Sequence, residues 1–269
     1  MGEIIEFPAY KEAKEKIIKL KKILADLVYE KDNLKFVICE NIKTQYILNF
    51  GSLEYKLYEA YCKYLRLRRK KEMIQAKKNR QESIDIETIE NDLDDEFAEY
   101  KKVLDEKIFD MKEALKRKEA GFLTDEEEIL IKTLYKKIVK KIHPDINPEI
   151  SDDEKEFFYK ATDSYKNGDL TTIQIIYDIV FSSEDSDTEA LSDKFFKDEV
   201  KRLEELIGKI QKDIDLIKSQ PPYTWKVFVE DKNKRAEKLK ELQNNLEAYE
   251  EAIRSQEEYI EDLMRDINE

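Results

Sequence analysis

The sequence contains few of the residues that form tight turns. Five glycines and five prolines occur among 269 residues, whereas these two residue types together make up roughly 12% of an average protein. A β-sandwich, barrel or propeller needs many turns, and this sequence does not supply them. The scarcity of turn residues therefore predicts an all-α fold of long helices with few breaks.

Residues that bind metals or form disulfides are also scarce. The chain has one histidine, His143, and two cysteines, Cys39 and Cys62. Two cysteines cannot build a disulfide framework, and with a single histidine they make a poor zinc site. A phosphate-binding loop, a nucleophile elbow and an HExxH-type pair are absent as well. We therefore expect no metal, no cofactor and no enzymatic activity.

The charge balance limits the partners that the whole chain can bind. Sixty-two acidic residues against 49 basic ones give a net charge of −13, which disfavours nucleic acid and anionic membranes as partners. No apolar run approaches the ~20 residues that span a bilayer, and the first residues lack the basic segment of a secretory signal. Together with the unpaired cysteines, these features predict a cytoplasmic protein without a membrane partner.

The few glycines and prolines predict where helices begin and end. Pro8 suits the first turn of a helix, and Gly51 followed by Ser52 predicts a break. Further stops and starts are predicted at Gly121 with Thr124–Glu127, at Gly168-Asp169 and at Pro221-Pro222. The predicted organisation is a long-helix region at residues 1–120, a helical module at 121–181, an acidic linker at 182–192 and a helical hairpin at 193–269.

The C-terminal third has the most regular apolar periodicity. Spacings of three and four alternate in two runs, as in the a/d seam of a coiled coil. The runs are Phe196, Val200, Leu203, Ile207, Ile210, Ile214 and Ile217, and then Leu239, Leu242, Leu246, Tyr249, Ile253, Gln256, Ile260, Leu263 and Ile267. The short connection predicts that the two helices pair as an antiparallel coiled-coil hairpin. The alternative is that a seam pairs with a partner helix, including one from a second copy in a homodimer.

A basic stretch is followed directly by an acidic one. Residues 63–80 carry nine lysine and arginine side chains and one acid, Glu72, whereas residues 82–99 carry nine acids and no base. The basic stretch, with tyrosines beside it, resembles a nucleic-acid or lipid-headgroup surface. The change of sign favours the alternative, in which two adjacent helices of opposite charge lie against each other.

The single histidine follows a basic helix. Residues 126–142 predict an amphipathic helix with five lysines and no carboxylate between Ile129 and Ile142. Pro144 disfavours helical geometry at His143, so the helix should end there. A second amphipathic helix is predicted at residues 153–166, and two short helices around a polar loop form an antiparallel hairpin.

This segment resembles the J domain of the DnaJ/Hsp40 co-chaperones over about residues 122–180. The tripeptide His143-Pro144-Asp145 ends a basic helix, and Tyr135 stands eight residues before the histidine, where the family carries its helix II tyrosine. Three further residues, Asn147, Phe158 and Tyr165, match the asparagine that often follows the tripeptide and the aromatic pair of helix III.

The segment departs from the family before the basic helix. The helix I signature Tyr-x-x-Leu-Gly-Val is absent, and Leu115, Gly121, Phe122 and Leu123 stand in that region. Either the long upstream helix takes the place of helix I, or Phe122 and Leu123 cover the hairpin. The full DnaJ architecture is not expected, because a Gly/Phe-rich linker and repeated CxxC motifs are missing.

The resemblance implies that the chain binds an ATP-bound, DnaK-type Hsp70 and stimulates its ATP hydrolysis, while the coiled-coil arms bind a protein client or partner. By position, the steering residues would be Lys132, Lys136, Lys137 and Lys140, and the trigger would be His143, Pro144 and Asp145. The hairpin would be packed by Tyr135, Ile138, Phe158 and Tyr165. The alternative is a helical scaffold or assembly protein that keeps this hairpin only as a structural element.

Overall fold

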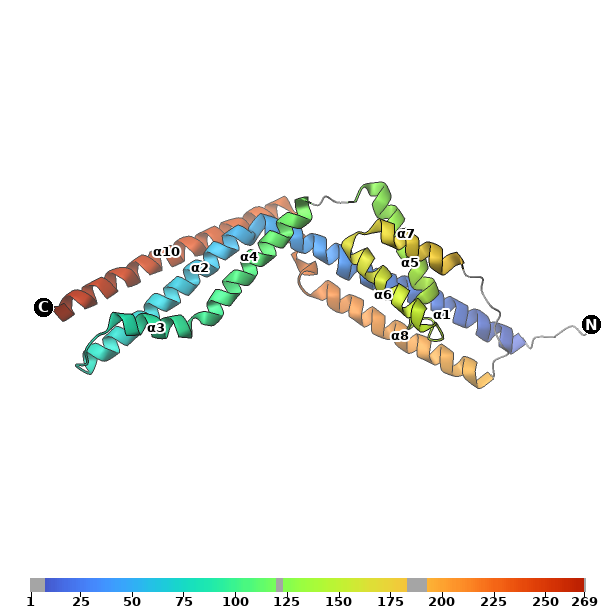
Figure 1. The fold of residues 1–269 in the computed structure, drawn as a ribbon, viewed down its shortest axis with the longest axis horizontal. Helices are drawn as coiled ribbons and strands as arrows, with labels where there is room; N and C mark the ends of the chain where they lie inside the picture. The colour runs from blue at the N-terminus through green and yellow to red at the C-terminus, as the bar shows by residue number, and fades with distance from the viewer. Residues whose placement is uncertain (1–7, 120–122, 183–192, 269) are drawn as a thin grey trace, which may run out of the picture. The chain divides into compact units, whose positions relative to one another are not determined.

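The computed structural model describes residues 8–119, 123–182 and 193–268, and within these ranges the chain is helical apart from short turns (Figure 1). The all-α class predicted from the sequence is confirmed. The elements are α1 (Pro8–Asp32), the π-helical turn η1 (Asn33–Ile38), α2 (Cys39–Asn79), α3 (Ile86–Glu96), α4 (Ala98–Glu119), α5 (Asp125–Ile142), α6 (Asp152–Asn167), α7 (Leu170–Ser182), α8 (Asp193–Ser219), the 3₁₀ turn η2 (Tyr223–Trp225), α9 (Lys226–Glu230) and α10 (Lys232–Asn268).

The chain divides into two compact units, each built from two separate stretches of sequence. Unit 1 comprises Met1–Asn41 and Phe122–Thr224, and unit 2 comprises Ile42–Gly121 and Trp225–Glu269. The candidate site lies in unit 1. Apart from Ser182 at the end of α7, the predicted acidic linker at residues 182–192 lies outside the described residues.

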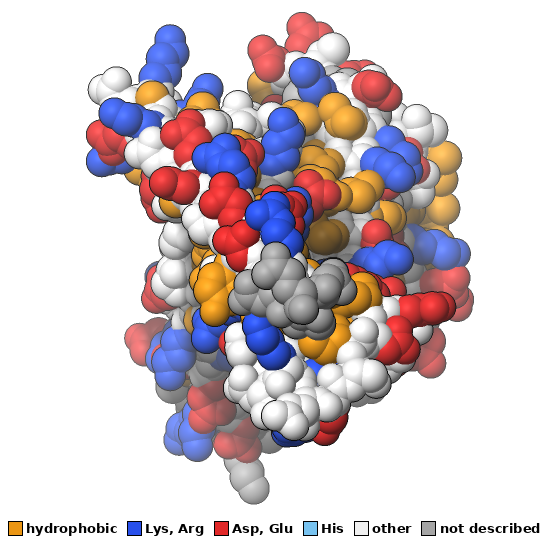
Figure 2. All heavy atoms as spheres, turned by 90° about the vertical axis from the view of Figure 1, so that its left-hand side faces the viewer, with side chains coloured by type: hydrophobic (Ala, Val, Ile, Leu, Met, Phe, Trp, Pro, Cys, Tyr) orange, Lys and Arg blue, Asp and Glu red, His pale blue; other side chains and the backbone are white. Residues whose placement is uncertain are grey.

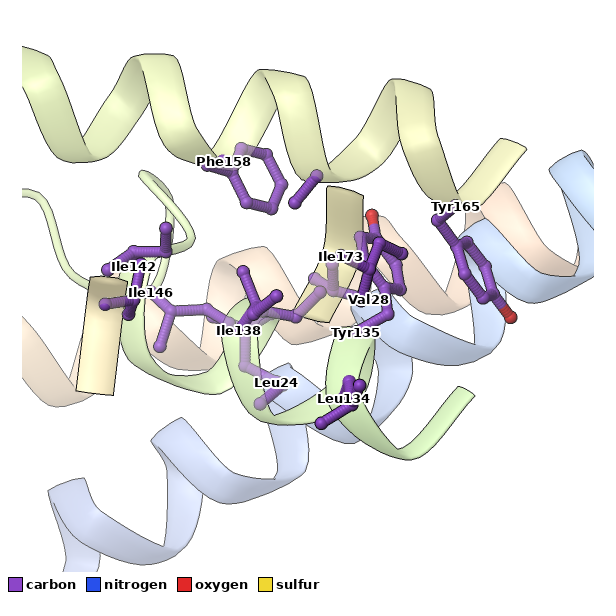
Figure 3. Packing of buried hydrophobic residues seen from close by; sticks show 14 of the residues in the cluster. Leu24, Val28, Leu134, Tyr135, Ile138, Ile142, Ile146, Phe158, Tyr165 and Ile173 are labelled. Carbon is purple, nitrogen blue, oxygen red and sulfur yellow. The ribbon is translucent and has the colours of Figure 1, made fainter. Parts of the chain in front are cut away.

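Unit 1 is a layer of short helices packed on two long ones. The helices α5, α6 and α7 pack against one another, and α1 packs against both α5 and α8. Figure 3 shows Leu24 and Val28 of α1 directed at the apolar stripe of α5, and all of these side chains are buried in one cluster. The single core explains why the α5–α6 hairpin is not an isolated module: its apolar face is shared with α1.

Local sequence signals determine the ends of α5 and α6. Both helices begin with a capping box, Thr124 with Glu127 and Ser151 with Glu154, which satisfies two backbone N–H groups at each start. Gly168 adopts φ +70° after α6, and the Asp169 N–H donates to the Ser164 carbonyl at 2.8 Å, as in a Schellman motif. The predicted helices at 126–142 and 153–166 are therefore confirmed to within one residue at each end.

The predicted antiparallel hairpin at residues 193–269 is wrong in its pairing. Both helices exist, but the seam of α8 packs on α1, where Leu203 and Ile214 are fully buried in the unit 1 core. The seam of α10 packs on α2 in unit 2, where Ile253 lies with Ala60, and Ile260 lies with Ile74. An a/d seam requires a helical partner without specifying which one, and α1 and α2 supply matching apolar faces.

The predicted helix break at Gly51 is also wrong. The residue lies inside α2, which runs on without interruption. A Cβ atom at this position would stand 3.1 Å from Ile47 Cγ2 and 3.2 Å from Met111 Cγ of α4. The glycine therefore allows the side chain of Met111 to approach the α2 backbone, which is a packing role rather than a helix stop.

Candidate functional site

The candidate site is the loop of residues 143–147 that follows α5. His143 has the extended backbone geometry (φ −70°, ψ 126°) that Pro144 imposes on the residue before it. The His143 carbonyl accepts the N–H groups of Ile146 at 3.0 Å and Asn147 at 2.9 Å. The Asn147 side-chain amide donates to the carbonyls of Lys140 at 3.1 Å and Lys141 at 2.9 Å. Asn147 thereby satisfies carbonyl groups left without partners at the end of α5.

His143 faces inward and Asp145 faces outward. The imidazole packs edge-on against the Phe158 ring, with centroids 4.7 Å apart, and its Nδ1 accepts the Asp145 N–H at 3.1 Å. Burial lowers the pKa of His143 from 6.5 to about 4, so the ring is neutral at pH 7 and Nδ1 remains an acceptor. Asp145 is exposed, so its carboxylate is presented to solvent next to a neutral histidine.

Three of the four predicted steering lysines form an exposed row on α5: Lys136, Lys137 and Lys140. The Lys136 ammonium lies 2.9 Å from Asp26 of α1, and the Lys137 ammonium lies over the Tyr177 ring of α7 at 5.3 Å. The fourth, Lys132, is half-buried and forms an ion pair with Glu128 on its own helix. All three exposed lysines lie on α5, with Lys140 nearest to the loop, while Lys136 pairs with α1 and Lys132 pairs within its own helix.

The four predicted packing residues lie in the buried interior, with Ile138 fully buried and Phe158 7% exposed (Figure 3). Tyr135 of α5 stacks on Tyr165 of α6 with ring centroids 4.1 Å apart and an angle of 6°. This stack joins the two helices of the hairpin at the end opposite the loop.

Hydrogen bonds from the same two tyrosines reach the long helix. The Tyr135 hydroxyl donates to Asp32 Oδ2 at 2.7 Å, and the Tyr165 hydroxyl donates to Asn33 Oδ1 at 2.9 Å. Burial raises the pKa of the Asp32 carboxyl, while the Tyr135 hydrogen bond and the nearby Lys31 and Lys35 act in the opposite direction. Asp32 and Asn33 mark the change from α1 to the π-helical turn η1.

The long helix α1 covers the apolar face of the α5–α6 hairpin. Leu24, Ala25 and Val28 of α1 lie in the same buried cluster as Tyr135 and Ile138. Leu123 is partly buried against this cluster, whereas Phe122 lies outside the described residues. Both α1 and α8 also contribute polar contacts to the loop, from Lys21 and Arg202. No sequence motif marks these residues, which stand far from the loop in the chain.

The basic stretch of α2 pairs with the acidic helix α3 that follows it. Arg66 contacts Asp94 at 2.8 Å, Arg69 contacts Glu96 at 2.9 Å, and Glu90 pairs with Arg66 and also with Lys70. Figure 2 likewise shows basic and acidic side chains interleaved on the face that it presents. The ion pairs agree with the expectation of two adjacent helices of opposite charge.

The described part of the chain shows neither a metal site nor a membrane-spanning helix. Within it, no group of three or more histidine, cysteine, aspartate or glutamate side chains is placed to hold a metal ion. None of the helices in the described ranges is long and apolar enough to cross a membrane. Comparison with protein-family models, with curated proteins and with solved structures yields no match.

Proposed function

We propose that this chain is a cytoplasmic J-domain-type co-chaperone, which binds a DnaK-type Hsp70 in its ATP state and stimulates ATP hydrolysis. The observation that carries the proposal is the combination at the end of α5: an exposed row of lysines leads to a loop in which Asp145 is exposed and His143 is neutral. In this proposal the Hsp70 performs the chemistry, and the chain is not itself an enzyme.

Electrostatics supports a role for the lysine row in partner recognition. The chain carries a net charge of −13, yet Lys137 and Lys140 are exposed on a helix without a carboxylate between Ile129 and Ile142. Lys136, beside them, is paired with Asp26 of α1. A local patch of opposite sign on an acidic protein attracts an acidic surface and speeds its association. An acidic partner surface would therefore meet the loop directly after encountering the lysines.

The remaining helices supply a surface for a client or a protein partner in this proposal. Unit 2 consists mostly of the long helices α2 and α10 with α3 and α4. We assign client or partner binding to these helices of unit 2 and Hsp70 binding to α5.

A second candidate function, a helical scaffold, is favoured by two contacts between the hairpin and α1. These are the buried Tyr135–Asp32 hydrogen bond and the Lys136–Asp26 ion pair. Such contacts would be expected if the hairpin served only to build unit 1. In a scaffold, Asp145→Asn would change neither partner binding nor any ATPase rate.

The lysine row provides the experiment that tests the proposal. The double variant Lys137→Gln/Lys140→Gln should associate with ATP-bound Hsp70 about tenfold more slowly at low ionic strength, because steering by surface charge is lost. The matched control is Lys160→Gln/Lys166→Gln, which removes two exposed lysines from α6. Equal association rates for the two double variants, measured by stopped-flow fluorescence at several salt concentrations, would argue against α5 as the binding face.

A further inference from the structure

The loop of residues 143–147 is held by a side chain from outside the hairpin. Arg202 of α8 donates from Nη1 to the Asp145 backbone carbonyl at 2.9 Å. The same guanidinium makes two 2.8 Å hydrogen bonds to Glu199, from Nε and from Nη2. The Glu199 side chain is 12% exposed and the Arg202 side chain is 34% exposed, so the ion pair is partly buried.

The two bonds to Glu199 fix the direction of the third. A guanidinium is planar, and a carboxylate that binds two of its nitrogens side by side determines the plane and the rotation of the group. The remaining nitrogen, Nη1, is then directed at the Asp145 carbonyl. Because the carbonyl is held toward α8, the Asp145 carboxylate remains on the exposed side of the loop.

The contacts within the hairpin do not fix this carbonyl. The Asp145 N–H is bound by His143, and the Asn147 amide caps α5. From α1, Lys21 donates to Asn147 Oδ1 at 3.2 Å, which holds the end of the loop. Of the hydrogen bonds that hold this loop within the described part of the chain, the one from Arg202 acts on the Asp145 carbonyl.

We propose that Arg202, oriented by Glu199, is a positioning residue for the loop, so that the Hsp70-binding site is complete only when α8 is docked on α1. This inference rests on the proposed function and adds α8 to its site. A loop that samples other conformations when Arg202 is lost would bind with an affinity reduced by the fraction of competent molecules. The maximal stimulated rate, once bound, would stay the same.

The test compares Arg202→Ala with Lys201→Ala in the full chain. Lys201 is the neighbouring residue on α8 and is exposed, so its removal takes away the same charge without touching the loop. For Arg202→Ala we expect the concentration that half-saturates Hsp70 stimulation to rise about tenfold with an unchanged plateau. Arg202→Lys retains the charge but cannot bind Glu199 with two parallel bonds. Its half-saturating concentration should lie between that of the wild type and that of Arg202→Ala.

A second readout does not depend on Hsp70. The backbone amide signal of Asp145 in a ¹H–¹⁵N spectrum should shift and broaden in Arg202→Ala and stay in place in Lys201→Ala. An unchanged Asp145 signal together with an unchanged half-saturating concentration overturns the inference. If the wild-type chain does not stimulate Hsp70 while the Asp145 signal still responds to Arg202→Ala, the proposed function fails and the positioning contact stands. If Arg202→Ala does not fold, the half-saturating concentration and the Asp145 amide signal are measured on Arg202→Lys instead.

Discussion

The imidazole of His143 is expected to stay neutral well below the pH at which an exposed histidine binds its proton. Burial lowers the pKa from 6.5 to about 4, the nearby Asp145 carboxylate opposes this, and Lys31 adds to it. Nδ1 accepts the Asp145 N–H, and a protonated ring has no acceptor nitrogen. Protonation would therefore place a charge against Phe158 and remove a hydrogen bond that shapes the loop.

The sign of the effect on stability follows from the two pKa values. Between pH 6.5 and about 4 the unfolded chain binds a proton at His143 and the folded chain does not, so the free energy of unfolding falls as the pH is lowered. One pKa unit corresponds to about 1.4 kcal/mol, which gives a loss of about 3 kcal/mol across the whole window. Carboxylates titrate in the same range, so the wild type must be compared with His143→Gln, which cannot titrate at this position.

Two measurements check this prediction. Because the chain has one histidine, its imidazole gives a single pair of ring-proton signals, Hδ2 and Hε1, whose titration yields the pKa directly. Urea denaturation at pH 7 and at pH 4.5 gives the difference in unfolding free energy between the wild type and His143→Gln. As the pH falls, the wild type should lose stability relative to His143→Gln. A titration midpoint near 6.5, or a difference that does not change with pH, would refute the packing argument for His143.

Two substitutions in the helix interfaces test the packing. Tyr135→Phe removes the donor to buried Asp32 and should lower the free energy of unfolding by about 1–3 kcal/mol, because a buried acceptor is left unpaired. The control Tyr159→Phe, on an exposed side chain, should lower it by less than half as much. Equal losses for the two variants would contradict the role of the Asp32 hydrogen bond. Gln256→Leu should stabilise the chain by about 1 kcal/mol, since Gln256 Oε1 is buried without a hydrogen-bond partner among the described residues. The exposed Gln243→Leu is its control, and urea denaturation that shows destabilisation by Gln256→Leu would count against the assignment.

The local structure of the candidate site could be predicted because short-range physics determines it. Pro144 ends α5 through its effect on the preceding residue, and Thr124 and Ser151 cap their helices through bonds that span three residues. The lysine row follows from helical periodicity alone. These features need no knowledge of which distant segment packs where.

The tertiary partners could not be predicted, because apolar periodicity does not identify a partner. The seams of α8 and α10 suit each other by spacing, yet α1 and α2 cover them. The same limit applies to Arg202 and Asp32, each of which contacts the hairpin from a distant part of the chain. Gly51 shows a related failure: a glycine that permits close packing inside a helix looks, in the sequence, like one that ends it.

Asp145→Asn in single-turnover ATP hydrolysis by a DnaK-type Hsp70 tests the central proposal most directly. The Asp145 side chain is exposed, so the substitution leaves the core intact, and Asp163→Asn on α6 is a control of the same chemistry at another exposed aspartate. We predict that the wild type and Asp163→Asn accelerate hydrolysis and that Asp145→Asn does not. Equal acceleration by Asp145→Asn, or no acceleration by the wild type, would contradict a J-domain function for this chain.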